Sequence, residues 1–330
     1  MHKYSSIRVG VAGVTGYTGV ELMRRLARHP RADVRLAMAS GTSGSRRIPA
    51  LARIWDAPVE AVDPDRLAAD TDAVFLALPD TIAAELAPAL AARGCRVFDL
   101  SGAFRLRSPE ARRQWYPHTP AAAAATYGLT ERYRDALREA ELVACAGCYP
   151  TAAILSLQPL AAAGLLEPGV VIDAKSGVSG AGKTPSERTH FSECHGSIAA
   201  YGVFAHRHAA EIEQEVGMRV TFVPHLVPLD RGILETIYAR LKPGVGDGQI
   251  GAALGAAYAA SPFVRLTGSE LPEIKHVAHT NFCDIGWRVD RPGGQLVMVA
   301  CIDNLVKGAA GQAIQNFNVA YGFDETLGLN

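Results

Sequence analysis

Cys148 is the residue whose type and position best suit covalent chemistry. It follows the apolar segment 142–145, and Tyr149, Pro150 and Thr151 after it open a segment with the composition of a helix. Proline fits the first position of a helix, so the thiol is expected at or just before the helix N-terminus. The helix dipole and the unsatisfied amides there favour the thiolate, which is the nucleophilic form of cysteine. The alternative is an inert core cysteine, because cysteines are often buried.

The spacing of the other cysteines gives no sign of a metal site or of a disulfide framework. Cys145 and Cys148 form a lone Cys-x-x-Cys pair, for which a thiol-redox site is one interpretation. A buried strand cysteine beside a separate functional one is the interpretation that we prefer. Free thiols in a reducing compartment fit this pattern best. The remaining cysteines are Cys95, Cys194, Cys283 and Cys301.

A second group that could do chemistry is the pair His206 and His208 at the expected entrance to a helix. A histidine is the natural acid or base for a thiol enzyme near neutral pH. Glu211 follows closely enough to orient one of the rings or to contact a substrate. The residue pattern alone does not separate the two. A third ligand at a diagnostic spacing is missing, so no metal is predicted.

A glycine-rich turn after the apolar segment 7–12 predicts a dinucleotide site. Glycines between a strand and a helix allow a tight turn and close backbone approach, and the free amides of the helix start attract a pyrophosphate. The expected contacts are Gly13, Thr15, Gly16, Tyr17, Thr18 and Gly19.

The end of the second expected strand, residues 34–39, indicates which dinucleotide is bound. An NAD site usually has Asp or Glu there to hold the ribose 2′-hydroxyl. This chain instead has Ser40, followed by Arg46 and Arg47. A hydroxyl and arginines suit a 2′-phosphate, so NADP is predicted; the alternative is that the arginines belong to a solvated loop.

The segment 175–183 is rich in glycine and serine and exposes its backbone, as expected where a flat or anionic group approaches. From Gly177 to Thr184 it also matches the Gly-x-x-x-x-Gly-Lys-Thr pattern of phosphate-binding loops. The context argues against ATP hydrolysis, because only a brief strand precedes the match and Pro185 interrupts any helix after it.

The elements that must position these residues change character near residue 148. Before it, short apolar runs alternate with helical patterns, which predicts an α/β, Rossmann-type doubly wound parallel sheet. After it, alternating patterns at residues 219–223, 232–241 and 295–302 predict a second α+β domain with a mixed or antiparallel sheet. A last helix is expected over residues 307–321, and it is able to pack back on the first domain.

Composition favours a small-molecule partner. The chain has 330 residues, 48% of them hydrophobic, with 33 basic and 33 acidic side chains. Two cores are the natural expectation at this length, and the balanced charge gives no basic field for a nucleic acid. No segment approaches the roughly 20 apolar residues of a membrane span, and no secretory segment opens the chain, so a cytoplasmic protein is predicted.

Several motifs in one order resemble the N-acetyl-gamma-glutamyl-phosphate reductase family, a branch of the aspartate-semialdehyde dehydrogenase superfamily. The match runs through nearly the whole chain. It is carried by the segments 13–19, 99–106, 127–131, 147–151, 176–182, 206–208, 281–286 and 303–313.

The resemblance implies a domain arrangement and an activity. The expected domains are residues 1–148 plus 309–330 for NADP and residues 149–308 for catalysis and for assembly into a homodimer or tetramer. The implied activity is NADPH-dependent reduction of an acyl phosphate to a semialdehyde in arginine biosynthesis, through a thioester on Cys148.

The resemblance also gives expected roles to individual residues. The pair His206 and His208 matches the segment that supplies the acid/base histidine, with a slight preference for His206. Ser179, Gly180 and Asn304 match positions that face the nicotinamide. Arg105 is the candidate for holding the acyl phosphate, and Ser101 in the same motif is a further substrate candidate. Asp80 stands where many members have a histidine after Leu-Pro, so that histidine's cofactor contact is not expected here.

Three alternatives remain open. Within the same chemistry they are an aspartate-semialdehyde dehydrogenase and a lysine-pathway reductase of a carrier-bound aminoadipyl phosphate. The segment 227–232 resembles the N-acetyl-glutamyl branch better, and the balanced charge shows no basic rim for a carrier protein. In a different class, the chain would be a non-catalytic NADP-binding regulator, since a fold does not fix a function.

Overall fold

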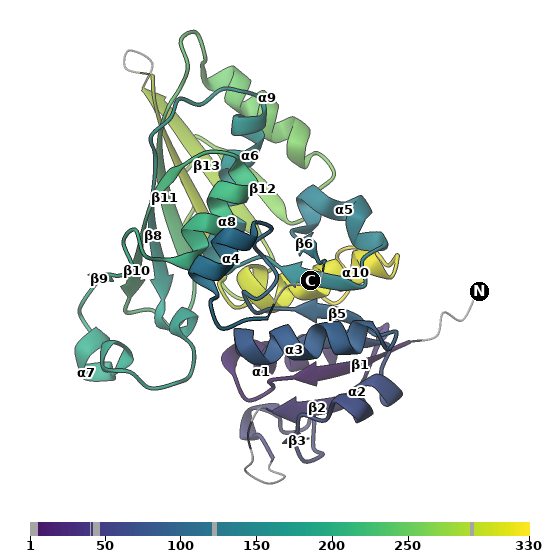
Figure 1. Cartoon of the computed structure of the whole chain (residues 1–330). Helices are drawn as coiled ribbons and strands as arrows, with labels where there is room; N and C mark the ends of the chain where they lie inside the picture. The colour runs from purple at the N-terminus through teal and green to yellow at the C-terminus, as the bar shows by residue number, and fades with distance from the viewer. Residues whose placement is uncertain (1–5, 40, 42–46, 121–123, 291–293) are drawn as a thin grey trace. The chain divides into compact units, whose positions relative to one another are not determined.

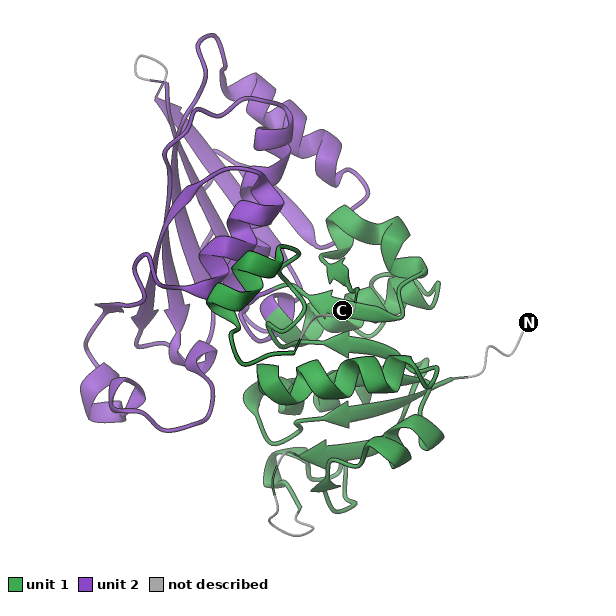
Figure 2. Ribbon diagram, in the orientation of Figure 1, with its two compact units in different colours: residues 1–146, 309–330 green, residues 147–308 purple. Residues whose placement is uncertain are grey.

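The computed structural model describes residues 6–39, 41, 47–120, 124–290 and 294–330. The chain forms two compact units (Figure 2). Unit 1 comprises Met1–Ala146 and Ala309–Asn330, and unit 2 is Gly147–Gly308. Unit 2 is therefore one continuous insertion into the sequence of unit 1.

Unit 1 is built on a parallel sheet with the strand order β3, β2, β1, β4, β5, β7, β6 (Figure 1). All side chains of β4 and β7 are buried, as expected for short apolar strands in a parallel sheet with helices on its faces. The strands are β1 (Ile7–Ala12), β2 (Ala32–Ala39), β3 (Glu60–Ala61), β4 (Ala73–Leu76), β5 (Arg96–Asp99), β6 (Thr126–Gly128) and β7 (Leu142–Cys145).

The helices of unit 1 come from both ends of the chain. They are α1 (Tyr17–Leu26), α2 (Pro64–Asp70), α3 (Asp80–Ala91), α4 (Pro109–Trp115), α5 (Thr130–Arg138) and the C-terminal α10 (Gly311–Ala320). Phe317 of α10 packs its ring against Phe75 in a tilted arrangement and against Phe98 edge-on, with centroids 5.7 and 5.8 Å away. Asn316 donates to the carbonyl of Gly128 at 2.9 Å. The last helix thus completes the core of the first unit, as predicted.

Unit 2 carries a mixed sheet with the strand order β12, β13, β14, β11, β8, β10, β9. The pairs β8–β10 and β12–β13 are parallel, and the other pairs are antiparallel. The strands are β8 (Val170–Gly177), β9 (Ala199–Ala200), β10 (Val220–Val227), β11 (Ile233–Arg240), β12 (Val264–Gly268), β13 (Cys283–Asp290) and β14 (Gln295–Ile302).

One face of this sheet is covered by helices. The long apolar helix α6 (Cys148–Ala162) packs against β11 and β14, and α8 (Arg207–Val216) packs against α6 and β10. The remaining helices of the unit are α7 (Phe191–Cys194) and α9 (Asp247–Tyr258). Ile233, Glu235 and Ile237 alternate with partly exposed residues along β11, so these three face the helical layer.

Short helical turns complete the chain: η1 (Pro49–Leu51), η2 (Val178–Ala181), η3 (Glu187–Thr189), η4 (Ile274–His276) and the π-helical turn η5 (Val306–Ala310). The last of these interrupts the helix expected over residues 307–321, so that α10 begins only at Gly311. Within the described ranges, no helix has the length and apolar character needed to cross a membrane.

The structure confirms the predicted fold class and refines the start of α6. Cys148 is itself the first helical residue, and Pro150 is the third rather than the first. Proline is tolerated there because the amides of the first turn have no partner inside the helix. The helix α9 and the strands β12 and β13 were not predicted from the sequence.

Candidate active site

Cys148 begins the 15-residue helix α6 behind Gly147, whose extended backbone (φ −69°, ψ 157°) caps the helix without a side-chain hydrogen bond. No acidic residue stands in the first turn. The thiol is partly exposed and forms no disulfide. The amides and dipole of the helix start stabilise a thiolate at this position, which suits a nucleophile.

Glu211 fixes the backbone just before Cys148. It lies in the interior of α8 with 1% of its surface exposed, and its Oε1 accepts the backbone N–H of Gly147 at 2.9 Å. A buried carboxylate on a backbone amide makes a strong, charge-assisted hydrogen bond. The sequence placed Glu211 beside the histidines, and the structure brings it to the start of α6.

Two tyrosines lie beside the thiol. The hydroxyl of Tyr149 is 3.2 Å from that of Tyr201 and donates to the carbonyl of His225 at 3.2 Å. Burial raises the pKa of Tyr149 far above its usual range, with Tyr201 and Cys148 adding to the shift. Burial likewise raises the pKa of Tyr201 to about 12. Both side chains therefore remain neutral hydrogen-bonding groups at neutral pH.

The two predicted histidines differ in what their rings do. His206 is the N-cap of α8, and its Nδ1 accepts the backbone N–H of His208 at 3.1 Å. Burial lowers the pKa of His206 to about 4, and Arg207 shifts it in the same direction. The His206 ring is therefore neutral near pH 7 and carries its proton on Nε2.

His208 lies two residues further on, with 7% of its surface exposed. Its ring centroid is 4.7 Å from that of His206 and 5.9 Å from that of Tyr149, the residue after Cys148. Both histidines therefore lie near the start of α6, and only His206 has a capping role.

Ser179, Gly180 and Asn304 are brought together, although 124 residues separate the second from the third in sequence. Asn304 Nδ2 donates to Ser179 Oγ at 2.9 Å, and Asn304 Oδ1 accepts the backbone N–H of Gly232 at 2.7 Å. A Cβ on Gly180 would lie 2.8 Å from Ser176 Oγ, so a larger residue there would require the Ser176 side chain to move. These contacts hold the Gly- and Ser-rich segment beside β11.

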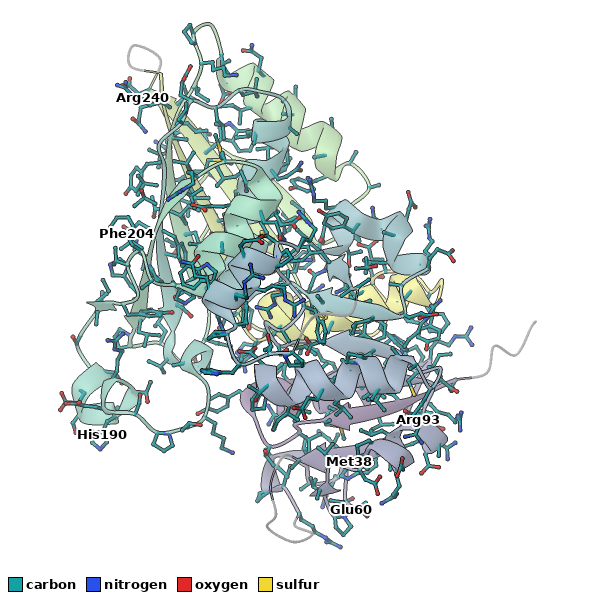
Figure 3. All side chains as sticks on the ribbon, in the orientation of Figure 1. Met38, Glu60, Arg93, His190, Phe204 and Arg240 are labelled. Atoms are coloured by element: carbon teal, nitrogen blue, oxygen red, sulfur yellow. The ribbon has the colours of Figure 1, made fainter. Side chains whose placement is uncertain are left out.

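The glycine-rich turn of unit 1 has the geometry of a dinucleotide loop. Gly13 has φ +98°, and a Cβ there would lie 2.1 Å from the carbonyl oxygen of Ala77. A Cβ on Gly19 would meet the carbonyl oxygen of Gly13 at 2.2 Å. The amide of Gly13 is held by the carbonyl of Met38, which Figure 3 labels at the end of β2.

Helix α1 starts at Tyr17 behind Gly16, with no side-chain cap and no acid in its first turn. Its first amides, next to Thr15 and Thr18, can therefore receive a pyrophosphate. The predicted 2′-phosphate contacts Ser40 and Arg46 lie outside the described residues, and Arg47 is exposed.

The two substrate candidates of unit 1 are tied into its sheet. Arg105 is 6% exposed; its Nε donates to the carbonyl of Cys145 and its Nη2 to that of Leu100, both at 2.8 Å. Ser101 donates to Asp99 Oδ2 at 2.7 Å, and burial raises the pKa of Asp99 to about 6. Arg105 joins the carboxyl ends of β5 and β7, and Ser101 lies at the same end of β5.

Other residues of the site escaped the sequence analysis. Tyr201, Asp303 and Gly308 were not predicted to belong to the site, because their partners are distant in the chain; the motif at residues 303–313 was the one signal that could have pointed to the last two. Asp303 is fully buried and accepts four hydrogen bonds, as described below. In the described part of the chain, no group of three or more His, Cys, Asp or Glu side chains is arranged to hold a metal.

Two family models match the chain. One, described as the NAD binding domain of semialdehyde dehydrogenases, matches residues 8–140, and the other, their dimerisation domain, matches residues 148–304. The chain resembles the solved aspartate semialdehyde dehydrogenase II of Vibrio cholerae, with a TM-score of 0.73, 16% identity and 96% and 99% of the two chains covered. It also resembles the Candida albicans enzyme solved with NADP, with a TM-score of 0.72 and 16% identity over 96% and 99% of the chains. At that identity the likeness concerns the fold alone.

Curated relatives are much more similar in sequence. An N-acetyl-gamma-glutamyl-phosphate reductase of Syntrophobacter fumaroxidans is 46% identical, and the match covers 98% of each protein. The protein of the same name from Geobacillus thermodenitrificans is 44% identical, again over 98% of each. The chain therefore belongs to the N-acetyl-gamma-glutamyl-phosphate reductase family of semialdehyde dehydrogenases.

Proposed function

We propose that this protein reduces N-acetyl-γ-glutamyl phosphate to N-acetyl-glutamate 5-semialdehyde and phosphate with NADPH, as the names of its relatives indicate. The observation that carries the proposal is Cys148 at the uncapped start of α6, beside two histidines. A helix-start thiolate attacks acyl groups well, and phosphate is a good leaving group from an acyl carbon.

Cys148 performs the first step. Its thiolate forms a bond to the acyl carbon, the bond to the phosphate oxygen breaks, and a thioester remains on Cys148. When bound, NADPH supplies the hydride that reduces the thioester carbonyl. The resulting thiohemiacetal oxyanion collapses to the semialdehyde and expels the Cys148 thiolate, and the one proton that the overall reaction consumes goes to the departing phosphate.

We propose His208 as the acid and base of these proton transfers. Nδ1 of His206 is occupied by the amide that it caps, and its pKa of about 4 leaves it neutral near pH 7. His208 lies beside it and is not the cap. This favours the second histidine of the pair over the first, which the sequence slightly preferred.

The dinucleotide site fits a pyrophosphate, because the Gly13 and Gly19 backbones leave no room for side chains at the turn. We propose NADP over NAD, because the sequence from Met38 to Arg47 contains no acid to hold a ribose 2′-hydroxyl. The ratio of kcat/KM for NADP⁺ and NAD⁺ tests this preference, and equal values would contradict it.

We further infer a homo-oligomer, dimer or tetramer, assembled through unit 2. The support is the family model of a dimerisation domain over residues 148–304. Light scattering coupled to size exclusion measures the mass, and a single mass of 35.0 kDa at micromolar concentration would contradict the inference. The six free cysteines are consistent with our placement of the enzyme in the reducing cytoplasm.

The substrate is tested in the oxidative direction. Phosphate-dependent reduction of NADP⁺ is measured with N-acetyl-glutamate 5-semialdehyde, aspartate semialdehyde and aminoadipate semialdehyde. The first should give the highest kcat/KM. A higher value with either of the other two would transfer the assignment to that branch of the chemistry.

The covalent step is tested with Cys148→Ser. Turnover should be abolished, because a serine hydroxyl is not ionised at neutral pH, while NADP⁺ affinity stays within about twofold. Cys194→Ser is the matched control, since this thiol is also partly exposed but lies in α7. An active Cys148→Ser enzyme would rule out the thioester.

A further inference from the structure

The π-helical turn η5 (Val306–Ala310) follows β14 and has no part in the steps described above. Its Gly308 N–H donates to the carbonyl of Asp303, five residues earlier, at 2.9 Å. Turns with this wide hydrogen-bond pattern are rare and occur mostly as single turns at functional positions. Gly308 places this turn in contact with Cys148, and that contact suggests a role for the turn.

The backbone of Gly308 packs directly on the nucleophile. A Cβ at this position would lie 2.7 Å from Cys148 Cβ and 3.1 Å from Cys148 Cα. Real Cβ atoms do not approach other carbons so closely, so any side chain at residue 308 would push α6 or the turn aside. The turn therefore blocks one side of the Cys148 Cα–Cβ bond and limits the rotamers open to the thiol.

The carboxylate of Asp303 holds this turn in place. It is fully buried, and its Oδ1 accepts the backbone N–H groups of Leu305 at 2.8 Å and Val306 at 3.1 Å. Its Oδ2 accepts the backbone N–H of His279 at 2.6 Å and Arg231 Nη1 at 3.2 Å. One carboxylate thus joins the start of the turn to two other loops of unit 2.

Lys307 anchors the turn one residue before Gly308. Its side chain is fully buried, with Nζ 5.9 Å from the centroid of the Phe263 ring. A fully packed side chain is costly to displace, so movement of the turn would disturb the packing around Lys307. The turn is therefore held at Asp303 and at Lys307, on both sides of the contact with Cys148.

We infer that Gly308 and Asp303 are positioning residues for the nucleophile: Asp303 fixes the π-helical turn, and Gly308 in that turn sets the orientation of the Cys148 thiol. The inference rests on the proposed role of Cys148. It predicts that small displacements at residue 308 impair the chemical step more than substrate binding.

The test compares Gly308→Ala with Gly255→Ala. A Cβ at Gly255, in the helix α9, would meet nothing within 4 Å, so this control makes the same chemical change without a contact. Gly308→Ala should lower kcat about 100-fold with KM changed much less, because a misplacement of about 1 Å has that cost. Gly255→Ala should keep both constants.

A second readout is the rate at which iodoacetamide alkylates each cysteine, followed by mass spectrometry from pH 5 to 10. In Gly308→Ala the pH profile of Cys148 should move, and the profile of Cys194 should not. A purely structural role would lower urea resistance without moving this profile. A kcat within about twofold of the parent, with an unmoved profile, overturns the inference.

Asp303→Asn covers the case in which Gly308→Ala fails to fold, judged by loss of a cooperative urea transition. The amide keeps the shape of the side chain and loses one acceptor oxygen and the charge opposite Arg231. It should lower kcat at least about tenfold and move the Cys148 alkylation profile in the same direction. Parent-like values in this variant also overturn the inference.

The nucleophile assignment of Cys148 and the positioning role of Gly308 can be refuted separately. If Cys148 of the parent protein is alkylated no faster than the other five cysteines, the nucleophile assignment fails, whatever the variants do. If Cys148 is fast in the parent protein and equally fast, with the same kcat, in Gly308→Ala, only the positioning role fails.

Discussion

At the scale of single residues, the histidine pair shows how two neighbouring side chains of the same type are given different tasks. His206 uses Nδ1 to cap α8, and burial lowers its pKa to about 4. His208 lies two residues further on and is not the cap. From sequence spacing, either ring could be the acid or base. The hydrogen bond by which His206 caps the helix is what distinguishes the two.

This difference predicts the outcome of replacing each histidine. His208→Asn should lower kcat by about 10² to 10⁴, which is the usual contribution of a general acid or base. His206→Asn should retain most activity, because asparagine is also a good N-cap. The measurement is kcat across pH 5 to 9 for both variants. If His206→Asn lost the greater activity, the assignment would be reversed.

A second residue-scale prediction concerns Glu235, which lies on β11 under the helical layer. Its side chain is fully buried, and neither oxygen has a hydrogen-bond partner among the described residues. Burial raises its pKa well above the usual value of 4.5. The folded protein therefore keeps the proton that the unfolded chain releases, and this group lowers stability increasingly as the pH rises above 4.5.

Glu235→Gln should consequently be more stable than the parent at pH 7 to 8, and the difference should shrink toward pH 4.5. Urea unfolding at these pH values measures the difference in stability. Glu270→Gln is the control, because the Glu270 side chain is exposed. A Glu235→Gln protein that is less stable than the parent at pH 8 would contradict this, because it would show that Glu235 is ionised in the folded protein and stabilised by a favourable interaction.

At the scale of elements, the structure shows which parts a sequence can predict and which it cannot. The parallel sheet and the glycine turn follow from short apolar runs and from glycines at fixed spacing, and both are confirmed. Helix α9 was missed because Asp247–Tyr258 is rich in alanine and glycine, with only two residues fully buried. A periodic apolar stripe was therefore absent from the pattern.

The π-helical turn marks another limit. The sequence over residues 307–321 has the spacing of one continuous helix, and no local propensity distinguishes a π turn from an α turn. The turn forms because Asp303 and Lys307 are buried at fixed places in the tertiary structure. The hydrogen-bond partners of Arg105 could not be predicted from the sequence either, because they are backbone carbonyls of other segments.

The element-scale prediction concerns α10, whose Phe317 is fully buried against Phe75 and Phe98. Phe317→Ala should lower the free energy of unfolding by about 3 to 5 kcal/mol, as large-to-small changes of buried aromatics do. Ile82→Ala is the control, since Ile82 is 39% exposed on α3. Urea unfolding checks both, and a loss at Phe317 no larger than that at Ile82 would contradict the role of α10 in the core.

At the scale of the whole molecule, the two units divide the chemistry. Unit 1 contains the glycine turn, and unit 2 contains Cys148, both histidines and the group of Ser179, Gly180 and Asn304. The break falls between Ala146 and Gly147, so Cys148, the proposed nucleophile, is the second residue of the inserted unit. The family models divide the chain at nearly the same place.

The interrupted sequence of unit 1 has a consequence for how the protein is made. A ribosome releases Gly147–Gly308 complete while unit 1 still lacks α10, whose Phe317 fills its core. We expect the inserted unit to fold and become protease-resistant before unit 1. This is the reverse of the usual order, in which the N-terminal domain folds first during synthesis. The test uses stalled nascent chains that end near residue 308, with a linker that holds their last residues outside the exit tunnel. These chains should resist protease within residues 147–308 and be cut within residues 1–146. The opposite pattern would refute this order.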